Sequence, residues 1–176
     1  SLGRHGKNEA KLRQAIEQLT HFIDSKPSAD LHASALVFLG WANTDLGFYD
    51  VALTQLQQAK EQSRLLEMET TLAYSSYSMM RIYLAQKNYQ AVTAMADEEI
   101  VTRFQANYLA RAHYELGEED KAISVLSSFK INHKNLWQPE DELRLGMYQS
   151  SLTGVNVQLP DEPKAHLVYC ESDWLF

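Results

Sequence analysis

Histidine, cysteine and carboxylate side chains are the residues through which this sequence could do catalytic or metal chemistry. The histidines lack the close spacing that zinc ligation requires, and the single cysteine, Cys170, is distant in sequence from most of them. They are His5, His21, His32, His113, His133 and His166. We therefore predict no metal site. One cysteine also rules out an intramolecular disulfide and favours a reducing compartment, so we expect a cytoplasmic location.

Paired carboxylates occur at Glu98-Glu99 and Glu118-Glu119. Neighbouring positions on a helix point about 100° apart, so neither pair converges on one substrate. His113 lies near Glu115, and we interpret the two as a pair on a helix face rather than as a catalytic dyad. Glycine-rich phosphate loops and nucleophile elbows are missing from the sequence. We predict a protein that is not an enzyme and needs no cofactor.

Composition narrows the class of protein further. The chain has 176 residues, 45% of them hydrophobic, with only 7 glycines and 4 prolines, which favours an almost entirely α-helical domain. No apolar run is long enough to span a membrane. The net charge is −7, and most of it falls in residues 113–176, so direct nucleic-acid binding is not expected. The acidic surface serves solubility or docks a basic partner.

Small and large apolar residues recur in residues 33–64 at offsets that let two antiparallel helices interlock. They are Leu36, Leu39, Gly40, Gly47, Tyr49, Ala52, Leu56 and Ala59. Gly40 and Ala52 are small where the helices cross, and Gly47 ends the first helix. This pattern resembles the tetratricopeptide repeat, a helix–turn–helix unit of about 34 residues. Such a unit cannot bury its apolar face alone, so it predicts neighbouring repeats.

Two further repeats follow with less regular spacing. The second is anchored by Tyr89, and Lys87 stands where the turn glycine belongs; the third keeps the register through Gly117 and Ala122. Residues 7–27 resemble the second helix of a repeat, ended by Pro27. This half-repeat is either a cap or a sign that the chain was cut from a longer protein. The linker-like residues 3–6 support the second interpretation, and both stay open.

The resemblance implies an all-α, right-handed solenoid of about three divergent repeats within residues 1–154. We expect a half-repeat at 7–27, repeats at 30–66, 67–100 and 101–130, and a capping helix at 139–152 that starts at Pro139. Residues 155–176 alternate in polarity and contain two prolines, which predicts an extended tail. Its apolar end, Asp173–Phe176, either covers the last helix or fills a groove in its own or a neighbouring molecule.

In this repeat family the first helices line a concave groove, with defined positions facing inward. Carried over, these positions imply a partner-binding surface rich in aromatic residues and arginine, which binding sites favour. The predicted site residues are Trp41, Tyr74, Tyr77, Arg81, Asn107, Arg111 and Tyr114. The other interpretation is that these aromatic residues are core, with Tyr74 and Phe104 the first to be buried. Val37 and Trp41 replace the Lys and Asn of the subtype that clamps chaperone tails, so such tails are not expected as ligands.

The sequence therefore predicts a protein–protein interaction module, a scaffold, adaptor or chaperone-like domain that binds a peptide or partner helix in its groove. An alternative is a ligand- or peptide-sensing input domain of a longer bacterial transcriptional regulator or signalling protein. Family membership does not name the partner. An exposed solenoid edge can self-associate, so a homodimer is one assembly that the resemblance allows.

Overall fold

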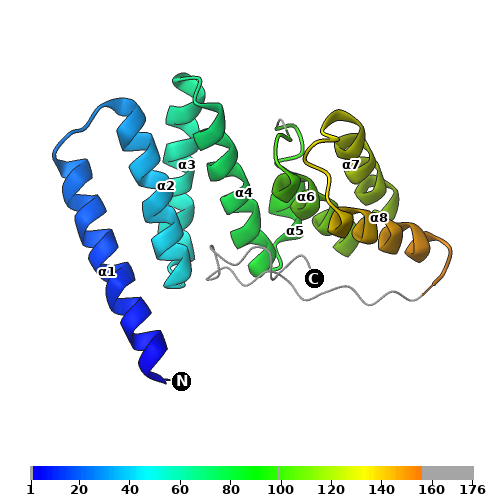
Figure 1. Cartoon of the computed structure of the whole chain (residues 1–176), viewed down its shortest axis with the longest axis horizontal. Helices are drawn as coiled ribbons and strands as arrows, with labels where there is room; N and C mark the ends of the chain where they lie inside the picture. Colours follow the sequence, from blue (N-terminus) through cyan, green and yellow to red (C-terminus); the bar gives the residue numbers. More distant parts are fainter. Residues whose placement is uncertain (1, 99, 156–176) are drawn as a thin grey trace. The chain divides into compact units, whose positions relative to one another are not determined.

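The computed structural model describes residues 2–98 and 100–155, with side chains from residue 8 onward. These residues form eight α-helices and no strand, which confirms the prediction of an all-α chain (Figure 1). The helices are α1 (Leu2–Asp24), α2 (Ala29–Asp45), α3 (Tyr49–Leu65), α4 (Glu69–Ala85), α5 (Tyr89–Thr93), α6 (Arg103–Glu115), α7 (Glu119–Asn132) and α8 (Pro139–Leu152). The predicted tail beyond Val155, with Asp173–Phe176, lies outside the described residues. None of the described helices has the length and apolar character needed to cross a bilayer.

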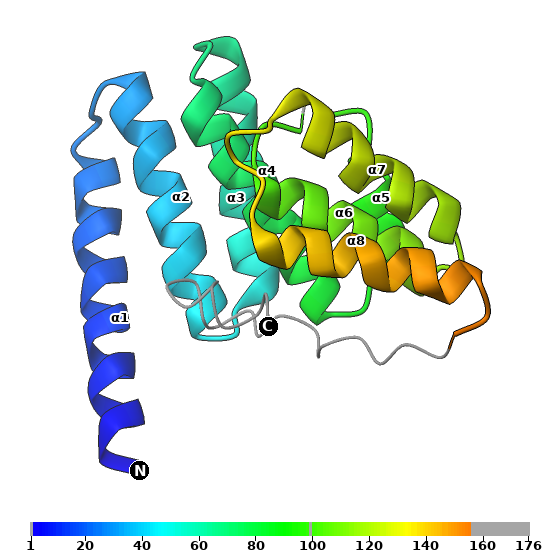
Figure 2. The same cartoon turned by 45° about the vertical axis from the view of Figure 1, so that its right-hand side comes forward.

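The chain divides into two compact units, and the division falls inside α4, between Ile82 and Tyr83. In the first unit, α2 lies between α1 and α3 and packs against both (Figures 1 and 2). Ala33, Ala52, Leu56 and Ala59 are fully buried there. Gly40 lies directly under Leu56, because a Cβ added to Gly40 would meet the Leu56 Cγ at 2.6 Å. The small residue is therefore what allows α2 and α3 to approach so closely.

Five of the described helices, α2, α3, α4, α6 and α8, end in the same way. After α2, the amide of Phe48 donates to the carbonyl of Asn43 at 2.8 Å and the amide of Gly47 to that of Thr44 at 3.0 Å. This pair of bonds defines the Schellman motif, whose turn residue must adopt the left-handed conformation. It recurs after α3, α4, α6 and α8, and its left-handed residues are Gly47, Glu67, Lys87, Gly117 and Gly154. Lys87 therefore occupies a glycine conformation, with φ of 56°.

The second unit packs α6, α7 and α8 around a small apolar core. Its buried members are Ala106, Ala110, Ala122, Leu126, Phe129, Leu145 and Tyr148. Both α6 and α8 begin with reciprocal capping boxes, at Thr102 with Gln105 and at Gln138 with Asp141. The helix α5, in contrast, covers only five residues. It ends before the acidic Asp97-Glu98, and negative charge at a helix C-terminus opposes the helix dipole.

Candidate functional site

Four aromatic rings on α2 and α4 form a continuous series across the first unit, which we call the aromatic row: Phe38, Trp41, Tyr74 and Tyr77. Phe38 and Trp41 meet edge to face, with ring centroids 5.4 Å apart. Trp41 and Tyr74 are 5.8 Å apart, and so are Tyr74 and Tyr77. Positions 38 and 41 are three residues apart on α2, and positions 74 and 77 on α4. Helical periodicity therefore turns each pair toward one side of its helix.

A hydrogen bond holds the centre of the row in place. The Trp41 Nε1–H donates to the Ser78 hydroxyl at 2.7 Å, and that hydroxyl donates to the Tyr74 carbonyl at 2.6 Å. The indole N–H and the Ser78 hydroxyl are thus both hydrogen-bonded, so the indole keeps one orientation. A fixed aromatic ring has little side-chain entropy to lose when a partner binds.

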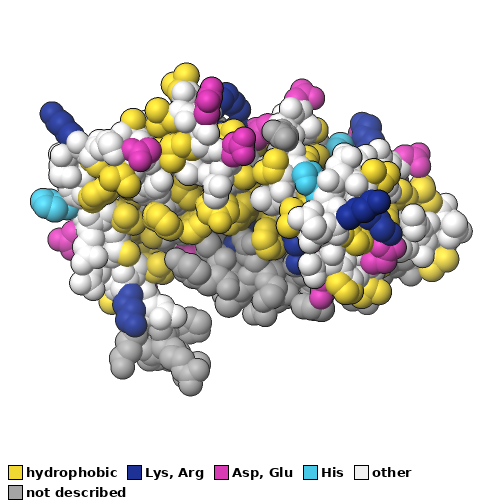
Figure 3. Space-filling view, turned by 45° about the horizontal axis from the view of Figure 1, so that its top comes forward, with side chains coloured by type: hydrophobic (Ala, Val, Ile, Leu, Met, Phe, Trp, Pro, Cys, Tyr) yellow, Lys and Arg dark blue, Asp and Glu magenta, His cyan; other side chains and the backbone are white. Residues whose placement is uncertain are grey.

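The row is partly exposed to solvent. Phe38 is 49% exposed and Tyr74 is 41% exposed, Trp41 is half-buried, and Tyr77 is buried. The expectation that Tyr74 would be among the first to be buried is therefore wrong; the ring stands outward near the start of α4, beside Trp41 and Tyr77. Figure 3 shows hydrophobic side chains gathered over the helices of the first unit, on the left of that view.

The structure thus brings together three of the predicted site residues, Trp41, Tyr74 and Tyr77, and adds Phe38, which the repeat positions did not select. Arg81 lies one turn beyond Tyr77 on α4 and is 3% exposed. Burial of a guanidinium to this extent indicates a structural environment in this conformation. A binding role for Arg81 stays a prediction.

The remaining predicted residues, Asn107, Arg111 and Tyr114, lie on α6 in the second unit. Asn107 is 1% exposed, and its amide donates to the Asp141 Oδ1 at 2.8 Å. Arg111 is 5% exposed, and its Nε donates to Glu115 at 2.6 Å. The Tyr114 ring stacks on Tyr148 with centroids 4.8 Å apart. Asn107 and Tyr114 therefore join α6 to α8, whereas the Arg111–Glu115 bond lies within α6; the binding role of all three also stays a prediction.

Asp141 organises this polar region. Its fully buried carboxylate accepts two bonds from Arg103, at 2.8 and 3.1 Å, besides the bond from Asn107 and one from its capping partner, the Gln138 amide, at 2.9 Å. Arg144 and Tyr148 are buried nearby; burial lowers the pKa of the Arg144 guanidinium and raises the pKa of Tyr148 to about 12. The group is a hydrogen-bonded clasp between α6 and the start of α8.

A small pocket lies beside the aromatic row, at the seam between α1 and α2, and we call it the α1–α2 pocket. Its volume is about 230 Å³. It is lined by Leu12, Ala15 and Leu19 of α1 and by Phe38, Trp41, Ala42 and Asp45 of α2. Both sets follow helical spacing, which is the signal from which the pocket could have been found. The sequence predicts a helix over residues 7–27, but no local pattern indicates which helix it faces.

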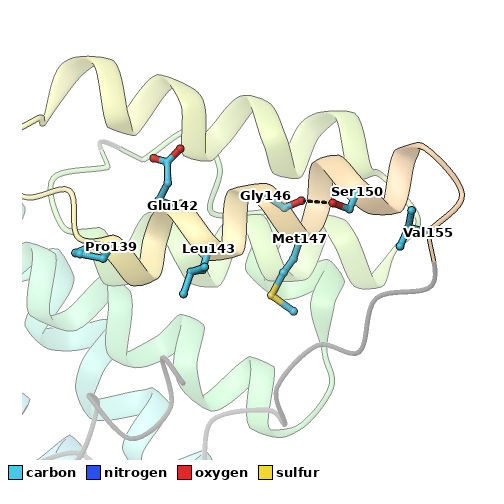
Figure 4. A pocket seen from close by; sticks show the side chains of 7 residues that line it. All are labelled: Pro139, Glu142, Leu143, Gly146, Met147, Ser150 and Val155. Atoms are coloured by element: carbon cyan, nitrogen blue, oxygen red, sulfur yellow. Dashed lines mark hydrogen bonds between the residues drawn. The ribbon is translucent and has the colours of Figure 1, made fainter.

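A second, shallower groove runs along α8 in the other unit (Figure 4). Leu143 is 68% exposed there, Val155 is 55% exposed, and Gly146 has nothing within 4 Å of an added Cβ. The full lining is Pro139, Glu142, Leu143, Gly146, Met147, Ser150 and Val155. The lining of this groove is mostly apolar, and Glu142 and Ser150 are its polar side chains.

The titratable side chains of the described residues bear on the predictions of metal and catalytic chemistry. Among them, no three His, Cys, Asp or Glu side chains gather as metal ligands would. His113 contacts Glu118 at 2.6 Å, whereas Glu115 pairs with Arg111, so the predicted pair of His113 with Glu115 is wrong. The two residues are two positions apart and so face different sides of α6.

Hydrogen bonds from Lys121 and then from His113 lower the pKa of Glu118. The three side chains therefore form a charged cluster at the turn between α6 and α7. Comparisons with models of known protein families, with curated proteins and with solved structures found no match for this chain.

Proposed function

We propose that this chain is a helical-repeat interaction module that binds a peptide or a partner helix along the aromatic row of its first unit. The observation that carries the proposal is the row itself: a connected set of rings, fixed at its centre by the Trp41–Ser78 bond and exposed at Phe38 and Tyr74. Rigid aromatic anchors of this kind are typical of binding hot spots.

The resemblance to tetratricopeptide repeats supports the same surface. Trp41, Tyr74 and Tyr77 stand at positions that would line the groove in that family, and α2 and α4 would be first helices of successive repeats. A protein partner suits the row better than a small molecule does, because the rings spread along two helices instead of enclosing a cavity. An extended peptide or a helix can contact several of them at once.

Peptide selection provides the test. A displayed library of random peptides is selected on the wild-type chain, and the enriched peptides are measured against Tyr74→Ala and Phe38→Ala by calorimetry. Each variant removes an exposed ring, so we expect affinity to fall at least about tenfold, equivalent to ~1.4 kcal/mol. The matched control is Leu65→Ala, which removes an exposed hydrophobic side chain, 84% exposed, at the end of α3.

Equal binding by wild type and both ring variants would overturn the proposal. Loss of binding by the Leu65→Ala control to the same extent would do so as well, since the contact would then lie elsewhere. Circular dichroism of each variant shows whether the helices remain intact.

A further inference from the structure

We propose that Ser78 determines which side chains the aromatic row accepts: it holds the indole N–H of Trp41, so the partner residue that covers Trp41 is aliphatic or aromatic. The inference rests on the proposed function and names the ligand chemistry of that same surface. Ser78 is 5% exposed, so it acts through the Trp41 ring and is a positioning residue.

A partner bound along the row has to cover Trp41. Phe38 and Tyr74 are the exposed rings of the row, and Trp41 lies between them, with centroid distances of 5.4 Å to Phe38 and 5.8 Å to Tyr74. A peptide or helix that contacts both exposed rings therefore lies over the indole and removes it from water. Any polar group that the indole presents to this partner then needs a hydrogen bond.

The polar group of Trp41 is already paired inside the protein. An indole carries one N–H donor and no acceptor, and at Trp41 this N–H donates to the Ser78 Oγ at 2.7 Å. The Ser78 hydroxyl has a single O–H, which donates to the Tyr74 carbonyl at 2.6 Å. The hydrogen bonds thus begin on α2 and end on the backbone of α4, and the indole keeps no donor for a ligand.

This pairing favours an apolar residue over Trp41. Covering an N–H that is already hydrogen-bonded costs little, whereas covering an unpaired one costs the desolvation of a polar group. A leucine or phenylalanine at this place buries apolar surface against the ring and leaves no donor unsatisfied. An asparagine loses its water and receives no hydrogen bond from the indole, so it is disfavoured.

The test compares two synthetic peptides that differ at one residue. The parent is the tightest peptide selected on the wild-type chain, and nuclear Overhauser contacts to the indole identify its residue over Trp41. We expect this residue to be aliphatic or aromatic. The two probes carry leucine or asparagine there, because these side chains have similar shapes, and calorimetry gives the ratio of their affinities.

The expected change is a loss of discrimination. Wild type should bind the leucine peptide at least about tenfold more tightly than the asparagine peptide. In Ser78→Ala the indole N–H is unpaired under leucine and can donate to the asparagine carbonyl, so the preference should fall at least about fivefold. A lower fraction of folded protein would affect both peptides equally, so this ratio separates positioning from a purely structural role.

The matched control is Ser75→Ala on the same helix. Ser75 is fully buried and donates to the Thr71 carbonyl at 2.8 Å, the same four-residue bond that Ser78 makes to Tyr74. This variant should keep the wild-type preference for leucine.

Two further variants examine the hydrogen bond itself. Ser78→Thr retains the hydroxyl and should retain the preference. Trp41→Phe removes the N–H, so adding Ser78→Ala in that background should leave the ratio unchanged.

A measurement without peptide follows the same bond. Trp41→Phe assigns the indole resonance of Trp41 in ¹H–¹⁵N spectra among the chain's 3 tryptophans. Exchange of this N–H with solvent should be slow in wild type and in Ser78→Thr and much faster in Ser78→Ala. Equally slow exchange in Ser78→Ala would contradict the role assigned to Ser78.

A polar residue over Trp41 in the parent peptide would overturn the inference. So would an unchanged ratio in Ser78→Ala, or an equal fall in Ser75→Ala or in the Trp41→Phe background. If the peptides need Phe38 and Tyr74 but prefer leucine without Ser78, the inference fails alone. If Phe38→Ala and Tyr74→Ala bind like wild type, the proposed function fails and the inference fails with it.

Discussion

Leu56 is seated on Gly40, so close that a Cβ at position 40 would lie 2.6 Å from its Cγ and 2.8 Å from its Cδ2. Leu56 is itself fully buried, between the helices that it joins. Gly40→Ala should therefore force α2 and α3 apart and lower the free energy of unfolding by roughly 1–3 kcal/mol, as overpacked cores do. Urea denaturation followed by circular dichroism measures this, and an unchanged midpoint would contradict the packing.

Gly146 provides the opposite case in the second unit. It lies in the interior of α8, and an added Cβ would have nothing within 4 Å. Alanine loses less backbone entropy than glycine in a helix, so Gly146→Ala should raise the free energy of unfolding by up to about 1 kcal/mol. The same denaturation experiment applies. A destabilised variant would mean that the α8 groove is filled in solution.

Glycine at position 87, in the turn after α4, should stabilise the fold. Lys87 adopts φ of 56°, whereas the equivalent Gly47 and Gly117 adopt 80° and 74°. Replacing Lys87 by glycine relieves left-handed strain of about 1–2 kcal/mol in the folded state. Glycine also raises the conformational entropy of the unfolded chain, which offsets part of this gain. Lys87→Gly should therefore stabilise by about 0.5–1 kcal/mol in thermal unfolding. Gln86→Gly, which relieves no positive φ, should destabilise, and stabilisation by both would refute the argument.

Local sequence signals located most of these features. The glycine at the helix crossing, the stop at Gly47 and the helix start at Pro139 each follow from one residue's own geometry, so spacing alone revealed them. The candidate site was harder to predict from the sequence, because it depends on which helix faces pack against one another. The roles of Asn107 and Arg103 are set by a carboxylate at Asp141, more than thirty residues away, and no local pattern announces that pairing.

The aromatic row was also only partly predictable from the sequence. Repeat positions selected Trp41 and Tyr74, which do meet, but they passed over Phe38, because it stands at a position that the repeat pattern does not assign to the groove. Trp41 also lines a pocket with residues of α1, and this proximity depends on the packing of α1 on α2. Exposure is a property of the packed chain, not of a residue's place in the repeat.

The buried carboxylate of Asp141 should be the most sensitive polar group of the second unit. It accepts two bonds from Arg103, and its removal leaves that guanidinium, only 20% exposed, without its main partner. Breaking one side of such a buried pair costs about 3–5 kcal/mol, so Asp141→Ala should lower the unfolding midpoint of this unit markedly. Asp120→Asn, at an exposed acid in the first turn of α7, should change stability by less than about 0.5 kcal/mol. Similar losses in both would contradict the clasp.

Acid should weaken the contact between α7 and α8 through Glu142. Hydrogen bonds from Lys130, at 2.5 Å, and then from the Trp137 indole, at 2.8 Å, hold the pKa of Glu142 below its ordinary value of 4.5. A carboxylate with a lowered pKa in the folded state stabilises the fold at pH values above 4.5, and this contribution is lost as the pH falls through the folded pKa.

The prediction concerns how steeply stability falls in acid. Urea midpoints measured from about pH 6 down to about pH 3 should decline less steeply for Glu142→Gln than for wild type. Lys130→Met removes the other partner and should flatten the same part of the curve, because the Glu142 carboxyl then regains a more ordinary pKa. The double variant should be no flatter than Glu142→Gln alone, since both variants remove the same Lys130–Glu142 interaction and Glu142→Gln also removes the titrating group. A wild-type slope in Glu142→Gln, or additive effects in the double variant, would show that acid acts on this unit through other groups.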